Sequence, residues 1–264
     1  SLYADTSNTS ITINGSVTAA NGKLRVDRTG SATNVSSTAT GDISVDEFQS
    51  DTSWSQIGST LPDFYARDFS IENGQFLRAR GGDGSVANPY RIFDVYSLQG
   101  IQSGAGTTPV NYILTQDIDA SGTAAWNGGS GFASTSLRGN FDGGGHTIDG
   151  LTSTGNLNSI GLFGIVRADG QDISIHDLKL TNVNIAGGIG VGGLIGAATS
   201  GTISVSDVSV GGSVTGSGNV GGAVGVISSA YTIADVRSSA DVSVCNVTPL
   251  LRVQYVSLLL ERYQ

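Results

Sequence analysis

The sequence predicts an all-β chain that folds as a right-handed parallel β-helix, a solenoid of stacked coils. Three observations lead to this prediction: a short internal repeat, apolar residues that alternate in short runs, and a composition rich in Gly, Ser and Thr. A unit of about 30 residues is too short to fold alone, so it must bury its apolar face against its neighbours.

The repeat has two markers that keep the same period. Asp177, Asp207 and Asp235 follow similar apolar runs at intervals of 30 and 28 residues, and a Gly-Gly-aliphatic-aliphatic-Gly motif recurs after 29 residues. The repeat-defining glycines are Gly192, Gly193, Gly196, Gly221, Gly222 and Gly225. Asp177, Asp207 and Asp235 should therefore lie above one another at one corner of the coil.

Within one copy the apolar residues alternate as strand residues do. The pairs are Ile173 and Ile175, Leu178 and Leu180, and Val183 and Ile185, with a change of parity between pairs. Alternation places one set of side chains on one face of a strand, and each parity change indicates a corner, so the sequence predicts three short strands per coil. A helical repeat is disfavoured because each Gly costs about 1 kcal/mol relative to Ala. Crossovers between parallel strands are nearly always right-handed, which gives the predicted hand.

Composition narrows the function classes. The 264 residues carry 13 Lys and Arg against 22 Asp and Glu, a net charge of −9, so nucleic-acid binding is not expected. The single cysteine, Cys245, permits no intramolecular disulfide. No apolar stretch is long enough for membrane insertion. The chain does not begin with Met, so we expect a fragment of a longer protein or a processed product.

Taken in order, the chain divides into four segments. Residues 1–46 alternate weakly and predict degenerate coils, and residues 47–105 concentrate aromatic residues and predict an inserted subdomain or lateral loops, with a short helix after Asp94. Residues 106–244 return to strands and contain the repeats. Residues 245–264 lack Gly and predict either a cap over the last coil or a non-native tail.

Several sequence motifs resemble those of secreted adhesins of the filamentous haemagglutinin type, which are exported by two-partner secretion. They include Gly81-Gly-Asp-Gly-Ser-Val-Ala-Asn-Pro-Tyr90, Asp94-Val-Tyr-Ser-Leu-Gln-Gly-Ile101, Phe141-Asp-Gly-Gly-Gly-His-Thr-Ile148 and Ile160-Gly-Leu-Phe-Gly164. The Gly-Gly motifs at residues 192 and 221 resemble the GLUG repeat of such adhesins. The resemblance implies a stalk segment at the bacterial outer surface, an outer-membrane transporter as partner of the full-length parent, a host receptor or glycan as ligand, and no catalytic residues or cofactor.

One alternative is a carbohydrate-active enzyme, a β-helical polysaccharide lyase or glycoside hydrolase. Asp142, His146 and Asp149 would be its catalytic candidates, because such enzymes need clustered carboxylates. A plain structural reading places Asp142 and His146 at a glycine turn. A second alternative is a ligand-free structural spacer.

Calcium and glycan sites follow from weaker patterns. Asp117 and Asp119 begin a loop like that of a calcium site, but Gly128 stands where the last ligand is required. Asp83 lies in a single fragment of the calcium-binding nonapeptide pattern. The aspartate ladder is either a set of turn residues or a cation-bridged column. Glycosylation signals occur at Asn8, Asn14, Asn34 and Asn246.

Four aromatic residues are the candidate ligand contacts: Trp54, Tyr65, Tyr90 and Trp126. Flat rings with a polar tip contact sugars well, so exposed rings in the aromatic-rich segment would form a platform for glycans. The competing interpretation is that these rings fill a core. The sequence thus predicts a rigid adhesin stalk whose contact surface lies within residues 47–105.

Overall fold

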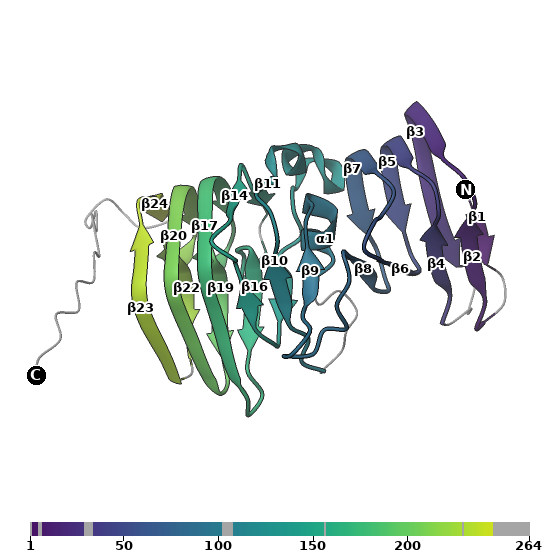
Figure 1. Ribbon diagram of the computed structural model, residues 1–264. Helices are drawn as coiled ribbons and strands as arrows, with labels where there is room; N and C mark the ends of the chain where they lie inside the picture. Colours follow the sequence, from purple (N-terminus) through teal and green to yellow (C-terminus); the bar gives the residue numbers. More distant parts are fainter. Residues whose placement is uncertain are drawn as a thin grey trace, which may run out of the picture.

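The chain forms a parallel β-solenoid of about 8 turns in the part that the structure, a computed structural model, describes. The described residues are 2–4, 7–28, 34–101, 108–155, 157–228 and 230–244. The coils stack along one axis into an elongated body, with β1 (Leu2–Ala4) at one end and β23 (Ala230–Ser238) and β24 (Asp241–Val244) at the other (Figure 1). This confirms the predicted fold class.

The N-terminal half is built from two stacks of parallel strands. One stack contains β1, β3 (Val17–Arg28), β5 (Ile43–Ser50) and β7 (Phe64–Ile71), and the other contains β2 (Ser10–Ile13), β4 (Ser36–Ala39), β6 (Ser53–Ile57) and β8 (Phe76–Ala79). Every pairing within the stacks is parallel. Successive coils therefore pair directly, as β-helix coils must.

The C-terminal half adds longer strands to the same plan. The largest sheet joins β9 (Tyr90–Ile92), β10 (Tyr112–Leu114), β11 (Ile118–Asp119), β13 (Phe141–Asp142), β14 (Thr147–Asp149) and β15 (Thr152–Thr154) to β17 (Asp172–Ala186), β20 (Thr202–Gly216), β23 and β24. A second sheet joins β12 (Thr135–Leu137), β16 (Phe163–Arg167), β19 (Ile195–Thr199) and β22 (Val224–Ile227), and β18 (Ile189–Gly192) pairs with β21 (Gly218–Gly221). Two short 3-10 helices, η1 (Ser121–Ala125) and η2 (Asn127–Gly129), precede β12.

The repeats stack in the register that the sequence predicts. Leu178 pairs with Val208, and Val208 pairs with Val236. The six alternating aliphatic residues of β17 are all buried. Aliphatic side chains of successive coils therefore lie above one another in a continuous core.

The corners differ in one respect from the prediction. Residues 172–186 form one strand, β17, instead of three short ones. The strand bends at Asp177 (φ 54°) and Asn182 (φ 52°), which both take the left-handed backbone conformation. Asp and Asn tolerate this conformation better than other side chains that carry a Cβ. The bends switch the inward face and account for the two changes of parity.

The aromatic-rich segment is not an insertion over residues 47–79. Strand β5 runs across the expected boundary at residue 46, and it pairs with β7 while β6 pairs with β8. Phe48, Phe69 and Phe76 are fully buried. These three aromatic residues are thus part of the core of ordinary coils. Only residues after 79 leave the strand pattern, as a loop over residues 80–89 and a short helix.

That helix, α1 (Val95–Gln99), confirms the predicted cap at Asp94. The Asp94 carboxylate accepts a hydrogen bond from the Ser97 backbone N–H at 2.7 Å, and the Ser97 hydroxyl lies 3.0 Å from the Asp94 backbone N–H. Such reciprocal capping satisfies two backbone donors at the start of the helix.

Within the described residues, β23 and β24 belong to the last coil of the stack. Tyr231, Ile233, Val242 and Val244 are exposed there, although their counterparts in earlier coils are buried. The predicted cap or tail of residues 245–264, with Cys245 and Asn246, lies outside the described residues. Every helix within the described residues is too short or too polar to span a lipid bilayer.

Candidate functional site

The prediction that exposed aromatic rings form a ligand platform is wrong for Trp54 and Trp126. The side chains of Trp54 and Trp126 are each 1% exposed. Trp54 stacks on Phe76 with ring centroids 6.0 Å apart, and Trp126 stacks on Tyr96 at 5.2 Å. Both indole rings therefore fill the solenoid core, which is the competing interpretation of these residues.

The two tyrosines of the platform do not form a shared surface. Tyr65 is 56% exposed on β7, whereas Tyr90 on β9 is half-buried and contacts Tyr112. Tyr65 and Tyr90 lie on different strands of different sheets. Flat rings that stack on a glycan must be open to solvent, and of the four only Tyr65 is.

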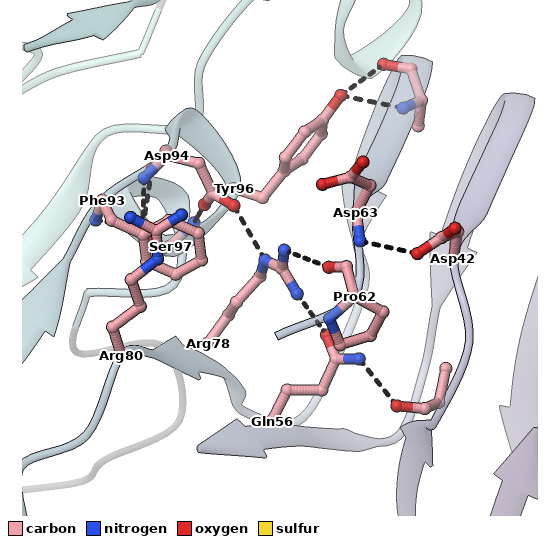
Figure 2. Close-up of polar contacts among 12 residues, drawn as sticks. Asp42, Gln56, Pro62, Asp63, Arg78, Arg80, Phe93, Asp94, Tyr96 and Ser97 are labelled. Atoms are coloured by element: carbon pink, nitrogen blue, oxygen red, sulfur yellow. Dashed lines mark hydrogen bonds and ion pairs between the residues drawn. The ribbon is translucent and has the colours of Figure 1, made fainter. Parts of the chain in front are cut away.

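A buried arginine, which the sequence analysis missed, organises the region around α1. Arg78 on β8 is 2% exposed and forms an ion pair with Asp94 at 2.8 Å. Its guanidinium also donates to the Gln56 side chain at 2.8 Å and to the Pro62 carbonyl at 2.7 Å. Figure 2 shows these three contacts converging on one guanidinium. Arg78 therefore ties α1 to two coils, and its partners satisfy a charge that is costly to bury alone.

Tyr96 anchors the same helix on its other side. Its hydroxyl donates to the Ala66 carbonyl at 3.1 Å and accepts from the Ala66 N–H at 2.8 Å (Figure 2). Burial raises the pKa of Tyr96 to about 12. The phenol thus stays protonated at neutral pH and serves as a structural donor.

The three residues of the carbohydrate-active alternative take separate partners. Asp142 accepts the Gly144 N–H at 2.8 Å, and Asp149 accepts from the Asn182 amide at 2.7 Å. His146 Nδ1 lies 3.2 Å from Asp117 Oδ1. Asp142 and His146 belong to one glycine turn, as the plain structural reading expects, while Asp149 faces the Thr181–Asn182 corner of the next coil.

The suggested calcium residues are held by hydrogen bonds, Asp83 and Asp119 within their own turns and Asp117 to the next coil. Asp117 accepts the Thr147 N–H at 2.9 Å, and this bond, followed by the contact with His146, lowers the pKa of Asp117. Asp119 accepts the Ser121 N–H at 2.9 Å, and hydrogen bonds with Ser121 lower the pKa of Asp119. Asp83 accepts from Ser85 and Asn88 inside the 80–89 loop, and these bonds lower its pKa, those of Ser85 most. Each of these carboxylates therefore already accepts hydrogen bonds from protein donors.

Among the described residues, three potential metal ligands that the sequence analysis did not combine lie close together. Asp142 on β13 is the register partner of His176 on β17, and Asp177 follows at the left-handed corner. One atom from each of these residues lies within 4.8 Å of the others. His176 Nδ1 is 2.9 Å from Asp177 Oδ2 and 3.6 Å from Asp142 Oδ1. We call these three residues the Asp-His-Asp corner.

The three aspartates of the ladder lie above one another at one corner of the coils, as predicted. Asp177, Asp207 and Asp235 occupy consecutive rungs, with φ angles of 54°, 52° and 51°. The next coil carries Ser206 beside Asp207, where this coil carries His176 beside Asp177. A histidine therefore joins the ladder at only one of these three rungs.

The repeat-defining glycines allow close packing between coils. A Cβ on Gly196 would lie 2.4 Å from the Ser159 carbonyl carbon, and a Cβ on Gly225 would lie 2.5 Å from the Val191 nitrogen. A Cβ on Gly192 or Gly221 would lie 2.3 or 2.0 Å from a backbone oxygen, and a Cβ on Gly193 or Gly222 would first meet the side chain of Val210 or Ser238, at 2.5 or 2.0 Å. Their function is thus structural, and the motif marks where two backbones approach.

A shallow groove of about 410 Å³ lies on one side of the solenoid. Its lining is Asn127, Ser130, Gly131, Phe132, Ala133, Ser134, Ser136, Ser153, Thr154, Leu157, Asn158, Ser159, Ile160, Gly164 and Ile165. No charged side chain is among these described residues, although the chain carries a net charge of −9. Hydroxyl groups, amides and aliphatic carbons thus line this groove.

The chain is similar to part of Halomucin from Haloquadratum walsbyi. The two sequences are 35% identical over 173 residues, an alignment that covers 61% of this chain but only 2% of Halomucin. No family model and no solved structure matches the chain significantly. The chain is thus similar to a short stretch of a far longer protein. The evidence for its fold is the register of the coils described above.

Proposed function

We propose that this chain is a rigid segment of a large secreted or cell-surface protein, within which it acts as a structural rod. The observation that carries the proposal is the parallel register that continues from β17 through β20 to β23 and β24. The similarity to 2% of Halomucin supports a role as one segment among many.

The rod would derive its stiffness from two features of the coil stack. Backbone hydrogen bonds between coils run nearly parallel to the axis, so bending the rod would strain many of them together. Repeat-defining glycines such as Gly196 and Gly225, which we call the glycine columns, bring the backbones of successive coils so close that sliding one coil over the next would meet steric resistance. A solenoid of this kind holds its ends at a fixed separation.

The finer proposal is that the rod belongs to an adhesin of the filamentous haemagglutinin type and presents a contact surface to a host receptor or glycan. The motifs at residues 81–101, 141–148 and 160–164 support that family. The uncharged groove supports a neutral glycan as ligand more than the aromatic residues do, since Trp54 and Trp126 are buried. Export through an outer-membrane transporter is part of the same proposal.

A ligand-free spacer is the second candidate function. The burial of Trp54 and Trp126 favours it, because it removes the contact surface that the sequence suggested. We do not propose an enzyme, since Asp142, His146 and Asp149 each bond to a different partner.

A glycan array with the full chain separates the two candidates. We expect binding of neutral glycans by the parent chain, loss of binding when Ser136→Trp fills the groove, and unchanged binding by Tyr65→Ala, which alters an exposed ring on another sheet. Binding that survives Ser136→Trp contradicts the groove as the contact surface. If the parent chain binds no glycan on the array, the result favours the ligand-free spacer.

The rod itself is tested by small-angle scattering on the same protein. An elongated particle whose cross-section matches one coil is expected. A compact particle would contradict the structural proposal whatever the array shows.

A further inference from the structure

We propose that the Asp-His-Asp corner, Asp142, His176 and Asp177, binds one divalent transition-metal ion of the Zn²⁺ type. This inference goes beyond the rod function, and either of the two can fail without the other. Its basis is a set of three ligand atoms from two successive coils that converge on one point.

The first step is the spacing of the ligand atoms. His176 Nδ1 lies 2.9 Å from Asp177 Oδ2 and 3.6 Å from Asp142 Oδ1, and all three atoms lie within 4.8 Å of one another. Ligand atoms at about 2.1 Å from a tetrahedral ion are about 3.4 Å apart. The three atoms therefore need only small side-chain movements to surround an ion.

The second step is how the fold holds these residues. Parallel pairing of β13 with β17 places Asp142 beside His176, and Asp177 follows at the left-handed corner, where its Oδ2 lies 2.9 Å from His176 Nδ1. The Gly144 N–H also holds Asp142 Oδ1 at 2.8 Å. Ligands on regular strands are positioned more firmly than ligands on free loops.

The third step is charge. Among the described residues, no Lys or Arg forms an ion pair with Asp142 or Asp177, so His176 is the one basic group that contacts these two carboxylates. A bound dication would neutralise both. The three side chains are 32–53% exposed, so an ion has access from solvent and water can complete its coordination.

The donor set selects the class of ion. Calcium takes six to eight oxygen ligands and magnesium keeps most of its waters, so neither favours an imidazole nitrogen. One imidazole and two carboxylates suit Zn²⁺, Co²⁺ or Ni²⁺. Since the ligands come from adjacent coils, the ion would link β13 to β17 and stabilise the folded chain.

The test is titration of the full chain with ZnCl₂ by calorimetry, repeated with CoCl₂ to record the absorbance of bound cobalt. We expect one Zn²⁺ per chain and a rise in melting temperature with zinc. His176→Ala should reduce the affinity by about tenfold or more, because even residues outside the first ligand shell contribute about 10- to 100-fold. Asp142→Asn and Asp177→Asn should weaken binding too.

Two matched variants serve as controls. His146→Ala removes the other histidine of the chain, whose Nδ1 contacts one carboxylate, that of Asp117. Asp207→Asn changes the equivalent corner of the next coil, where no histidine is present and the φ angle is 52°. Both should bind zinc as the parent does.

Three results would overturn the inference: a parent chain that takes up no zinc, equal affinity in His176→Ala, or loss of binding in His146→Ala instead. Circular dichroism of the metal-free variants shows whether each is folded. Asn tolerates a positive φ, so Asp177→Asn keeps the test valid even if His176→Ala is unstable.

Discussion

At the scale of single residues, the corners of the coils depend on side chains that tolerate unusual backbone geometry. Asp177, Asp207 and Asp235 hold positive φ angles near 50°, and every repeat-defining glycine except Gly222 holds a position where a Cβ would meet backbone atoms. Most other residues would add strain on the order of 1 kcal/mol or more at each corner. The residue type at a corner is thus explained by the backbone conformation that it must adopt, without the need for a catalytic or ligand-binding role.

The glycine columns give the first prediction. In Gly196→Ala the new methyl group would lie 2.4 Å from the Ser159 carbonyl carbon and 2.5 Å from the Ile160 nitrogen, and backbone atoms cannot move aside cheaply. We expect a loss of about 2–4 kcal/mol in the free energy of unfolding, measured by urea denaturation. Gly155→Ala is the control, since a Cβ there meets no heavy atom within 4 Å. Equal stability of the two variants would contradict the close approach.

The second prediction concerns Asp117, whose carboxylate joins two coils through the Thr147 N–H and the His146 ring. These bonds lower the pKa of Asp117 from its ordinary value of 3.8. Because the folded state has the lower pKa, the stabilisation is fully present above about pH 3.8 and is lost as the pH falls through the folded value. Asp117→Asn should therefore lower the melting temperature at pH 6, and the difference from the parent should shrink below pH 3.8.

Melting curves between pH 2.5 and pH 7 would measure this difference, about one pH unit below and three above the ordinary value of an aspartate. Asp172→Asn, at an exposed strand end, controls for the loss of one surface charge. A difference between parent and Asp117→Asn that does not vary with pH would contradict the proposed linkage.

Prediction from the sequence succeeded for residues whose role depends on neighbours in the sequence, and it failed for residues whose role depends on tertiary packing. The cap at Asp94 was predicted because a side-chain acceptor three residues before a backbone donor is a local pattern. The burial of Trp54 and Trp126 was not, because aromatic residues serve equally in cores and at binding surfaces. The proximity of Asp142 to His176 depends on pairing between residues 34 positions apart, which no single-copy motif encodes.

At the scale of elements, helix α1 interrupts the strand pattern without breaking the stack. It is held by the Arg78–Asp94 ion pair on one side and by Tyr96 on the other (Figure 2). Ring contacts continue from Phe69 to Trp126 and from Tyr96 to Trp126, so the helix packs on the same aromatic core as the coils before it. The core therefore passes from the N-terminal coils to the C-terminal coils through this helix.

The third prediction tests that attachment. Arg78→Met keeps the aliphatic length of the side chain but leaves Asp94 and Gln56 without their guanidinium partner. Removing one member of a buried pair typically costs about 3–5 kcal/mol. We expect a loss of this size in urea denaturation. Arg67→Met, which breaks the exposed pair with Asp46, should lower the free energy of unfolding far less. If both variants lose equally little, Arg78 does not hold the helix.

At the scale of the whole molecule, the fold class was predictable because the repeat supplies its own register. Two markers with one period fix which residues stack, and the pairing of Leu178 with Val208 and Val236 follows. The N-terminal coils contain the same stacking without a visible repeat, because strands β5 and β7 share burial pattern but little sequence. That is why the segment from residue 47 resembled an insertion.

The last prediction uses the modular character of the stack. Deleting residues 173–202 removes one period and would bring β13, β14 and β15 against β20, and β16 against β22. Each of these strands would meet a partner of the same pattern, since Phe141 would face Val205 in place of Ile175. In a solenoid each coil contacts only its neighbours, so the shortened chain should fold cooperatively. Scattering should show a rod shorter by about 4.8 Å, the spacing of paired strands.

Deleting residues 173–187, half a period, is the matched control. It would join strands whose inward faces do not coincide, because the repeat-defining glycines would lie where the buried aliphatic residues of β17 lie in the parent chain. We expect this shortened chain not to fold. The Asp-His-Asp corner is absent from both deletions, so neither should bind zinc as the parent does. If the full-period deletion unfolds while the half-period deletion folds, the coils are not the independent units that the register indicates, and the length of the rod could not be set simply by the number of repeats.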